Sequence, residues 1–520
     1  MGKQKMLFVK SFDKRVLFST EELAREVLDD PHYDNIPFVD KGSIKRAFDL
    51  YGDKLVSLDQ DVNSPLGGIT LNIEGHFLAS NLPEIETIVI DQSCDTDMLD
   101  QILGDNQDIT HIGLTAYVSG MDKTIDLIKH IQEKYPEKEL YVGGVGAVYP
   151  HIEAVIQEKN KICTAEGVSF LRKHLGLSQL KSEEMRITSV HGQAAFIPLS
   201  RPAIYVVTQL GCFNNCDFCI TNKMHRYNPF SKSEQIINFF DQLMKNTNHD
   251  EFVVLCEPNA FNPVAVWKRV FDFFIENAKF YDNKVFLFGP SSIKTLSQFD
   301  LEKIQYESSL KIFFVNYGIE KTVGEGYEKN GGDPKGMIRH MNRLGIVTNH
   351  SYIVGLPEQN SEMVDEEIRN NLEYESDFIN IITFKPIPKT TLYAQLEKRN
   401  RIITMKLPPE FLYVDGYLPF DHEYFGPGFT LLEQTFKAYY ENEKGIVDIC
   451  NNVCNKLIRL WEICGSQVLL QLAEKYLETS RKRLPSFSKR MPSEVTKEYK
   501  RRLLDTQKLF DKTLNKILVK

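Results

Sequence analysis

The sequence predicts an α/β protein with an N-terminal doubly wound, Rossmann-like sheet, a central partial barrel of six βα units and a mainly helical C-terminal region. Short apolar runs alternate with segments of helical spacing in residues 85–175 and again in residues 203–395. This alternation is typical of parallel sheets. Beyond residue 430 only helical spacing continues. We place the domains at 1–185, 201–395 and 396–520, with a mixed-charge linker at 186–200.

In the N-terminal domain, strands are expected at Thr87–Asp91, His111–Thr115, Leu140–Gly143 and Ile162–Thr164, with a helix at Met121–Glu133. Open sheets of this kind bind ligands at the carboxyl ends of their strands. The loops that contain Gly143-Gly144 and Glu166-Gly167 follow two of these strands. They are therefore candidate ligand loops, although glycine pairs are also common turn residues.

The barrel strands are expected to run in order after the linker, with a helix between each pair. The expected ranges are Ile204–Thr208, Phe252–Leu255, Val285–Phe288, Ile312–Val315, Val347–Val354 and Ile379–Phe384. In parallel barrels the chemistry gathers at the carboxyl ends of the strands. Polar residues at those ends are therefore the candidate site residues.

Three cysteines follow the first of these strands closely. Cys212, Cys216 and Cys219 are spaced so that one short loop can turn three thiolates toward one point. Three thiolates leave one iron of a four-iron cluster open, as in a catalytic metal centre. Zinc, with His225 as the nearest fourth ligand, and unliganded core thiols are the alternatives. Nine cysteines in 520 residues, with no apparent signal peptide, favour the reducing cytoplasm over a disulfide framework.

The cysteine loop, with Phe218 before its last cysteine, resembles the Cys-x-x-x-Cys-x-x-Cys motif of the radical S-adenosylmethionine (radical SAM) superfamily. The resemblance implies that Cys212, Cys216 and Cys219 hold a [4Fe-4S] cluster. It also implies that S-adenosylmethionine binds the open iron and yields a 5′-deoxyadenosyl radical when an electron donor such as flavodoxin or ferredoxin reduces the cluster.

Downstream segments match the family in the expected order. Glu257 follows the second barrel strand, where the family binds the amino group of S-adenosylmethionine. Glu320 ends the fourth strand, and the resemblance implies that it contacts the ribose or methionyl part of the same molecule. The run from Ser351 to Glu358 resembles the family's adenine-contacting motif Gly-x-Ile-x-Gly-x-x-Glu, with Ser in place of the first Gly. Its matching residues are Ser351, Ile353, Gly355 and Glu358. The run from Phe384 to Tyr393 looks like the family's turn after the sixth strand, with Lys389 in place of glycine.

Residues 55–175 resemble the N-terminal domain of cobalamin-binding radical SAM enzymes. The resemblance places the nucleotide tail or corrin of cobalamin near Thr115, Tyr117, Ser119, Gly143 and Gly144. Residues 65–68 stand where many cobalamin domains carry a cobalt-ligating histidine, and they contain none. His32, within residues 30–35, lies well upstream and is interpreted as part of a turn. A lower cobalt face without a ligand and a degenerate domain without cobalamin both fit this pattern.

The C-terminal part carries no clear motif. Residues 394–430 are rich in Pro, Gly, Phe and Tyr and are interpreted as a packing seam, with a substrate-pocket lining as the alternative. Cys450, Cys454 and Cys464 lie on helical spacing among apolar residues, which favours core thiols over an auxiliary cluster.

A net charge of −9 and a pI near 5.8 argue against a general nucleic-acid binder, and no apolar run is long enough for a membrane span. The sequence therefore predicts a cobalamin-dependent radical SAM enzyme, a methyltransferase acting on a small metabolite or natural-product precursor. Radical SAM chemistry of rearrangement, cyclisation or oxidation, and a non-catalytic iron-sulfur protein, are the alternatives. Neither the substrate nor the oligomeric state follows from the sequence.

Overall fold

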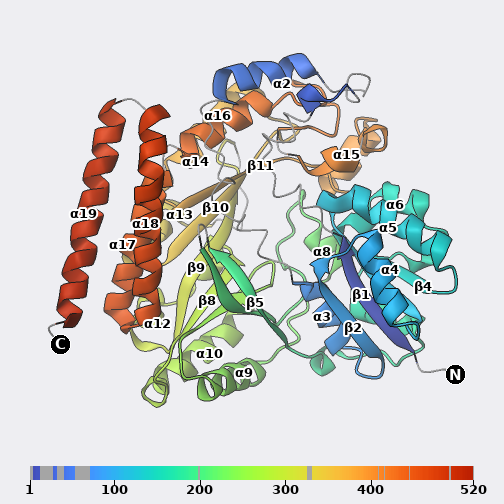
Figure 1. The fold of residues 1–520 in the computed structure, drawn as a ribbon, viewed down its shortest axis with the longest axis horizontal. Coiled ribbons are helices and arrows are strands. Elements are labelled where there is room, and N and C mark those ends of the chain that lie inside the picture. Colours follow the sequence, from blue (N-terminus) through green and yellow to red (C-terminus); the bar gives the residue numbers. More distant parts are fainter. Residues whose placement is uncertain are drawn as a thin grey trace.

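The computed structural model describes residues 4–11, 27–31, 40–52, 71–196, 199–324, 331–407, 409–414, 416–443, 446–490 and 493–518. The interpretations of residues 32–35 and 65–68, and residues 197–198 of the predicted linker, fall outside these ranges. Figure 1 shows the N-terminal sheet on one side, the barrel strands in the middle and the long C-terminal helices on the opposite side. The predicted α/β fold class is confirmed.

The N-terminal sheet is parallel, with strand order β2-β1-β3-β4. Its strands are β1 (Lys5–Ser11), β2 (Glu86–Ser93), β3 (His111–Ala116) and β4 (Glu139–Gly143). Its main helices are α3 (Ile73–Ser80), α4 (Thr96–Asp105), α5 (Met121–Lys134), α6 (Pro150–Val155) and α7 (Gly167–His174). Three of the four predicted strands are confirmed, and the predicted helix is α5. The prediction for Ile162–Thr164 is wrong, because this segment makes only a single bridge from Ile162 to Val142.

Strand β1 was not predicted, although it is central in the sheet. Leu7 and Val9 pack into one side of the domain, and Met6 and Phe8 pack into the other. A strand buried on both faces is a continuous apolar run without alternation. Because this run is short and isolated at the start of the chain, it lacks the neighbouring pattern that revealed the other strands.

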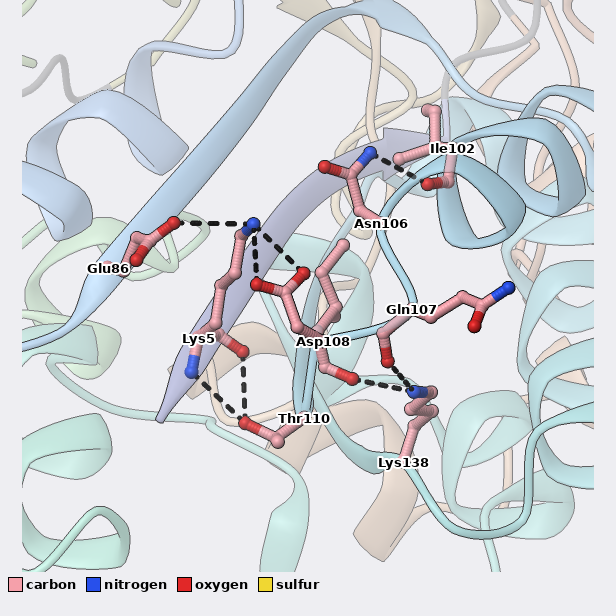
Figure 2. A network of polar contacts seen from close by, with 9 residues as sticks. Lys5, Glu86, Ile102, Asn106, Gln107, Asp108, Thr110 and Lys138 are labelled. Carbon is pink, nitrogen blue, oxygen red and sulfur yellow. Dashed lines mark hydrogen bonds and ion pairs between the residues drawn. The ribbon is translucent and has the colours of Figure 1, made fainter. Parts of the chain in front are cut away.

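Polar contacts hold the amino ends of these strands together (Figure 2). Lys5 Nζ donates to both carboxylate oxygens of Asp108, at 3.0 and 3.1 Å, and forms an ion pair with Glu86 at 3.3 Å. The Lys5 backbone N–H donates to Thr110 Oγ1. This network links β1 to β2 and to the start of β3, at the edge of the sheet opposite the strand ends that bind ligands in such folds.

The barrel sheet has the order β11-β10-β9-β8-β7-β6-β5. Its parallel strands are β6 (Leu199–Val207), β7 (Glu251–Leu255), β8 (Val285–Ser291), β9 (Leu310–Glu320), β10 (Val347–Val354) and β11 (Phe378–Thr383). All six correspond to predicted strands, so the partial barrel is confirmed. The segment predicted as a linker contains β5 (Thr188–Phe196), which pairs antiparallel with β6 and extends the sheet at this edge.

Helices cover the outer face of the barrel. They are α9 (Ser233–Asn246), α10 (Val264–Glu276), α12 (Leu301–Glu307), α13 (Pro334–Arg343), α14 (Ser361–Leu372) and α15 (Thr391–Lys398). Alternate residues of each strand face these helices: Val253 and Leu255 on β7, for example, pack with Trp267 and Phe271 of α10. The other residues of each strand therefore face the inside of the barrel.

The C-terminal helices are α16 (Leu432–Glu443), α17 (Ile446–Cys464), α18 (Gln467–Arg490) and α19 (Ser493–Leu518). Cys450 and Cys454 are buried on α17 against apolar residues of α18 and of the barrel, as the core-thiol interpretation expects. Burial raises the pKa of Cys454 to about 12. Phe411, Tyr417 and Phe429 are buried together with Ile44 of α2 (Lys41–Ala47), so this part of the aromatic segment packs as a seam.

No helix within the described ranges is a candidate for crossing a membrane. None of the helices there combines the length and the low charge that a bilayer span requires.

Candidate active site between the two domains

A cavity of about 510 Å³ lies between the carboxyl ends of β3 and β4 and those of β6 and β7. This volume is typical of small-molecule sites. Most of its wall is apolar and aromatic, with residues such as Phe77, Phe170 and Tyr205. The carboxyl ends of parallel strands from both sheets therefore face one shared space.

Four of the five residues predicted to lie near cobalamin line this cavity: Thr115, Tyr117, Gly143 and Gly144. Ser119 lies in the short 3₁₀ turn Val118–Gly120 and is not among the described lining residues. The structure thus brings the strand-end glycines and the β3 residues together, while the contribution of Ser119 stays a prediction.

Tyr117 makes a contact that the sequence did not reveal. Its hydroxyl donates to Glu74 Oε2 at 2.8 Å, and burial with the nearby Glu74 charge raises the pKa of Tyr117 well above its ordinary value. Glu74 lies on α3 and lines the same cavity. No sequence motif marks it, because the contact joins residues 43 positions apart.

The cysteine loop begins and ends at the cavity wall. Leu210 and Asn228 exchange two backbone hydrogen bonds, of 3.0 and 2.9 Å, which close the loop at its base. Gly211 at one end, and Thr221, Met224 and His225 at the other, line the cavity. The short helix α8 (Thr221–Met224) follows the last cysteine directly.

The three cysteines are partly buried thiols on this loop. The Cys219 N–H donates to the Cys216 carbonyl at 3.2 Å, and the Cys219 thiol contacts Thr221 Oγ1 at 3.4 Å. Within the described ranges, no three His, Cys, Asp or Glu side chains already converge as metal ligands. The donor chemistry nevertheless fits an iron-sulfur cluster, because thiolates are its usual ligands and these three share one partly exposed loop.

Residues of the sixth βα unit pack against the cysteine loop. The Leu392 N–H, at the start of α15, donates to the Asp217 carbonyl at 3.1 Å. Phe218 packs against the apolar cluster that contains Ile353 and Phe384. The predicted loop residue Phe218 and the predicted β10 residue Ile353 therefore belong to one apolar cluster, although they are far apart in the chain.

Glu257 lies at the end of β7 with only 1% of its surface exposed. Its Oε1 accepts hydrogen bonds from the Thr208 N–H and the Thr208 hydroxyl, both at 2.6 Å. Its Oε2 is buried without a hydrogen-bond partner among the described residues. Burial raises the pKa of Glu257 to about 7. A buried carboxylate with one unsatisfied oxygen fits the predicted ammonium ligand.

Glu320 ends β9 in the left-handed backbone region, with φ of 65°, and is 7% exposed. A non-glycine residue in this region is uncommon and marks a locally constrained backbone. In the register of the sheet Glu320 is paired with Tyr352, between the predicted residues Ser351 and Ile353 on β10. The register thus places the backbone of Glu320 beside the β10 segment that carries Ser351 and Ile353.

Gly355 and Glu358 lie beyond β10, with different surroundings. Gly355 has φ of 78°, and a Cβ atom there would come within 2.6 Å of Leu431. The close approach at Gly355 is therefore made by the C-terminal segment. Glu358 is exposed and forms an ion pair with Lys321 at 3.1 Å. The predicted adenine contacts of both residues stay predictions.

Two further polar side chains on the cavity wall have unsatisfied buried atoms: His225 Nδ1 and Gln209 Oε1 lack hydrogen-bond partners among the described residues. Burial lowers the pKa of His225, and the negative charge of Glu166 opposes this shift. The sequence had offered His225 only as a possible zinc ligand. Unsatisfied buried groups on the wall of an apolar cavity fit the presence of a bound ligand with hydrogen-bonding groups.

Among known proteins, only solved structures match the chain. No protein-family model matches the chain, and no curated protein sequence does. The chain is similar to the radical S-adenosylmethionine methyltransferase TsrM from Kitasatospora setae, solved with cobalamin and a [4Fe-4S] cluster, at 12% identity and a TM-score of 0.46, over 76% of this chain and 78% of that chain. A TsrM structure with tryptophan substrate and aza-SAM matches at 12% identity and a TM-score of 0.45, over 76% of each chain.

A third match is the apo form of the cobalamin-dependent S-adenosylmethionine radical enzyme OxsB. The identity is 12% and the TM-score 0.48, over 99% of this chain and 81% of that chain. At this level of identity the three matches concern the fold alone.

Proposed function

We propose that this protein is a cobalamin-dependent radical SAM enzyme, a methyltransferase that acts on an unactivated carbon of a small metabolite or natural-product precursor. The observation that carries the proposal is the position of the cysteine loop, whose two ends line the cavity between the domains. A cluster held by the loop and a cofactor held by the strand ends of the N-terminal domain would then share one reaction space.

In this proposal the cofactors supply the difficult chemistry and the protein supplies binding and orientation. When bound, the cluster, S-adenosylmethionine and cobalamin supply a 5′-deoxyadenosyl radical and a methyl group. Cys212, Cys216 and Cys219 hold the cluster, and Glu257 binds the amino group of S-adenosylmethionine. Glu320, Ser351 and Ile353 orient the rest of that molecule. The apolar cavity wall excludes water from the reacting atoms.

Residues from the N-terminal domain hold cobalamin in this proposal. Thr115, Gly143 and Gly144 approach it from the strand ends, and Tyr117 is oriented by its hydrogen bond to Glu74. An external one-electron donor such as flavodoxin or ferredoxin would supply the electron that the cluster needs.

Anaerobic reconstitution with iron, sulfide and cobalamin, followed by product analysis, tests the proposal. We expect Cys212→Ala to lose the brown cluster and all cleavage of S-adenosylmethionine, because one of three ligands is removed. The matched control is Cys450→Ala, a thiol buried in the helical core, which should retain both. Loss of the cluster in the control variant alone would overturn the assignment of the ligands.

The products separate the reaction classes. Cobalamin absorbance with formation of S-adenosylhomocysteine supports methyl transfer. 5′-Deoxyadenosine without S-adenosylhomocysteine indicates rearrangement, cyclisation or oxidation instead. A fully clustered, reduced protein that does not consume S-adenosylmethionine would contradict both enzymatic hypotheses.

A further inference from the structure

The inner face of the barrel carries rows of side chains, called layers below, because residues in register on neighbouring parallel strands lie side by side on one face of the sheet. Strand register defines one such layer, which is entirely apolar apart from a tyrosine hydroxyl: Tyr205, Val254, Phe288, Phe314 and Val347. The ring centroids of Phe288 and Phe314 are 4.5 Å apart. This layer, called the aromatic floor below, gives this part of the inner barrel face a hydrophobic surface.

The next layer toward the cavity contains two asparagines. Asn316 on β9 is in register with Pro290 on one side and Asn349 on the other, and Asn349 is in register with Phe378. Both asparagines point inward, because their chain neighbours point outward. Val315 and Tyr317 pack into the outer core, and His350 stacks on the Tyr317 ring. We call Asn316 and Asn349 the amide pair.

The amide pair has unsatisfied hydrogen-bonding capacity. Oδ1 of Asn316 and Oδ1 of Asn349 are both buried, and neither has a hydrogen-bond partner among the described residues. Buried polar atoms are nearly always hydrogen-bonded, and an unsatisfied one is costly. Two such atoms on adjacent strands at the same height indicate acceptors that are satisfied by a ligand.

The amide pair lies directly beneath the predicted S-adenosylmethionine residues. Ser351 and Ile353 follow Asn349 on the same face of β10, one and two layers closer to the strand ends. Cys256, two residues after Val254, reaches the height of Pro290 and also lines the interdomain cavity. The amide pair is not among the described lining residues of that cavity, and Cys256 connects the two along the barrel wall.

We propose that the amide pair and the aromatic floor bind the substrate, and that the part of the substrate held there is an uncharged ring or apolar group carrying an N–H or O–H donor. The name substrate rests on the proposed function. The two layers contain no charged side chain, so a carboxylate or ammonium group would lose its hydration without gaining a counter-charge. A neutral donor instead satisfies the asparagine oxygens.

Ligand-observed NMR on the full chain as purified tests this proposal with three probes of one ring: benzamide, benzoate and benzylamine. We expect benzamide to bind, and benzoate and benzylamine to bind at least about tenfold more weakly, because each buries an unpaired charge. In Asn316→Leu and Asn349→Leu, benzamide binding should weaken about fivefold or more, because a buried hydrogen bond is lost at similar side-chain size. Asn238→Leu, at an exposed position on α9, is the matched control.

Several outcomes would overturn the proposal. They are equal binding of the charged probes, no binding of benzamide to the unmodified chain, and unchanged benzamide binding in both variants with leucine in the barrel. The measurement needs neither the cluster nor turnover. Its failure is therefore distinct from failure of the proposed function, which would appear as absence of S-adenosylmethionine cleavage in the reconstituted protein.

Discussion

At the scale of single residues, Glu257 illustrates how burial sets chemistry. Its carboxylate is buried away from water, and one of its oxygens accepts two hydrogen bonds, both from Thr208. The remaining oxygen has no partner among the described residues, and burial raises the pKa to about 7. A carboxyl group in this state is poised between neutral and charged forms near neutral pH. A bound ammonium group would favour the charged form.

This state predicts a pH-dependent stability. Between the ordinary pKa of 4.5 and the folded value of about 7, the folded chain holds a proton that the unfolded chain has lost. The stabilisation is therefore present at pH 4.5 and below, and is lost as the pH rises through 7. When the pH rises from 5 to 8, we expect the free energy of unfolding of Glu257→Gln to increase by about 2 kcal/mol relative to that of the unmodified protein. Urea unfolding at both pH values measures this difference.

The control for this experiment is Glu474→Gln, an exposed carboxylate on α18. Its unfolding free energy should follow that of the unmodified protein at both pH values. If Glu257→Gln behaves in the same way as this control, the carboxylate is not buried as described, and its role as the ammonium ligand loses its physical basis.

At the scale of elements, the cysteine loop is closed by backbone at its base. Leu210 and Asn228 pair there, and Gly211 adopts φ of 70° directly before the first cysteine. A Cβ atom at Gly211 would lie 2.4 Å from the His225 carbonyl oxygen. Glycine is therefore needed both for the backbone angle and for the close approach of the two ends of the loop.

A pair of glycine variants separates these two effects. Gly176 has φ of 69°, but a Cβ atom there would meet no neighbouring atom within 4 Å, so Gly176→Ala introduces backbone strain alone. Gly211→Ala adds the clash with backbone. We expect it to lower the free energy of unfolding by about 2 kcal/mol more than Gly176→Ala, and to reduce the iron bound on reconstitution. Equal losses in chemical denaturation of the two variants would contradict the close contact.

At the scale of the whole molecule, the parts are tied by a few polar contacts across long sequence separations. Lys389 Nζ, in the turn after β11, donates to the Thr164 hydroxyl at 2.6 Å and so joins the barrel to the N-terminal domain. Lys456 on α17 pairs with Asp377 at the start of β11, and both side chains are almost completely buried. The Lys456 ammonium also donates to Asn342 Oδ1 at 2.6 Å.

The buried pair predicts how firmly the C-terminal helices are attached. Lys456→Met leaves Asp377 buried without its counter-charge, so we expect a loss of about 3 kcal/mol in unfolding free energy. Lys437→Met breaks a half-exposed pair with Asp365 and should cost less than about 1 kcal/mol. The double variant Lys456→Met with Asp377→Asn should recover part of the loss. Similar losses for the two lysine variants in urea unfolding would show that the Lys456 pair is not buried.

Much of this protein follows from local pattern. The six barrel strands were predictable because each is a short apolar run between helical segments, and the cysteine loop was predictable from spacing alone. Ser351 and Ile353 are two positions apart on one predicted strand, so their side chains are expected on the same face, because side chains alternate along a strand. The resemblance to radical SAM enzymes then supplied roles for residues on several separate strands, from Glu257 to Glu358.

Other features were decided only by tertiary structure. Strand β1 was not predictable, because its central place depends on pairing with strands about 80 and 105 residues away. The same holds for the contact of Glu74 with Tyr117 and for the amide pair, which is assembled by the register of β9 and β10. Sequence by itself determined the cysteine loop and the strands that carry the site. Tertiary packing decided which distant polar groups meet there, because contacts between remote segments leave no periodic trace in either segment.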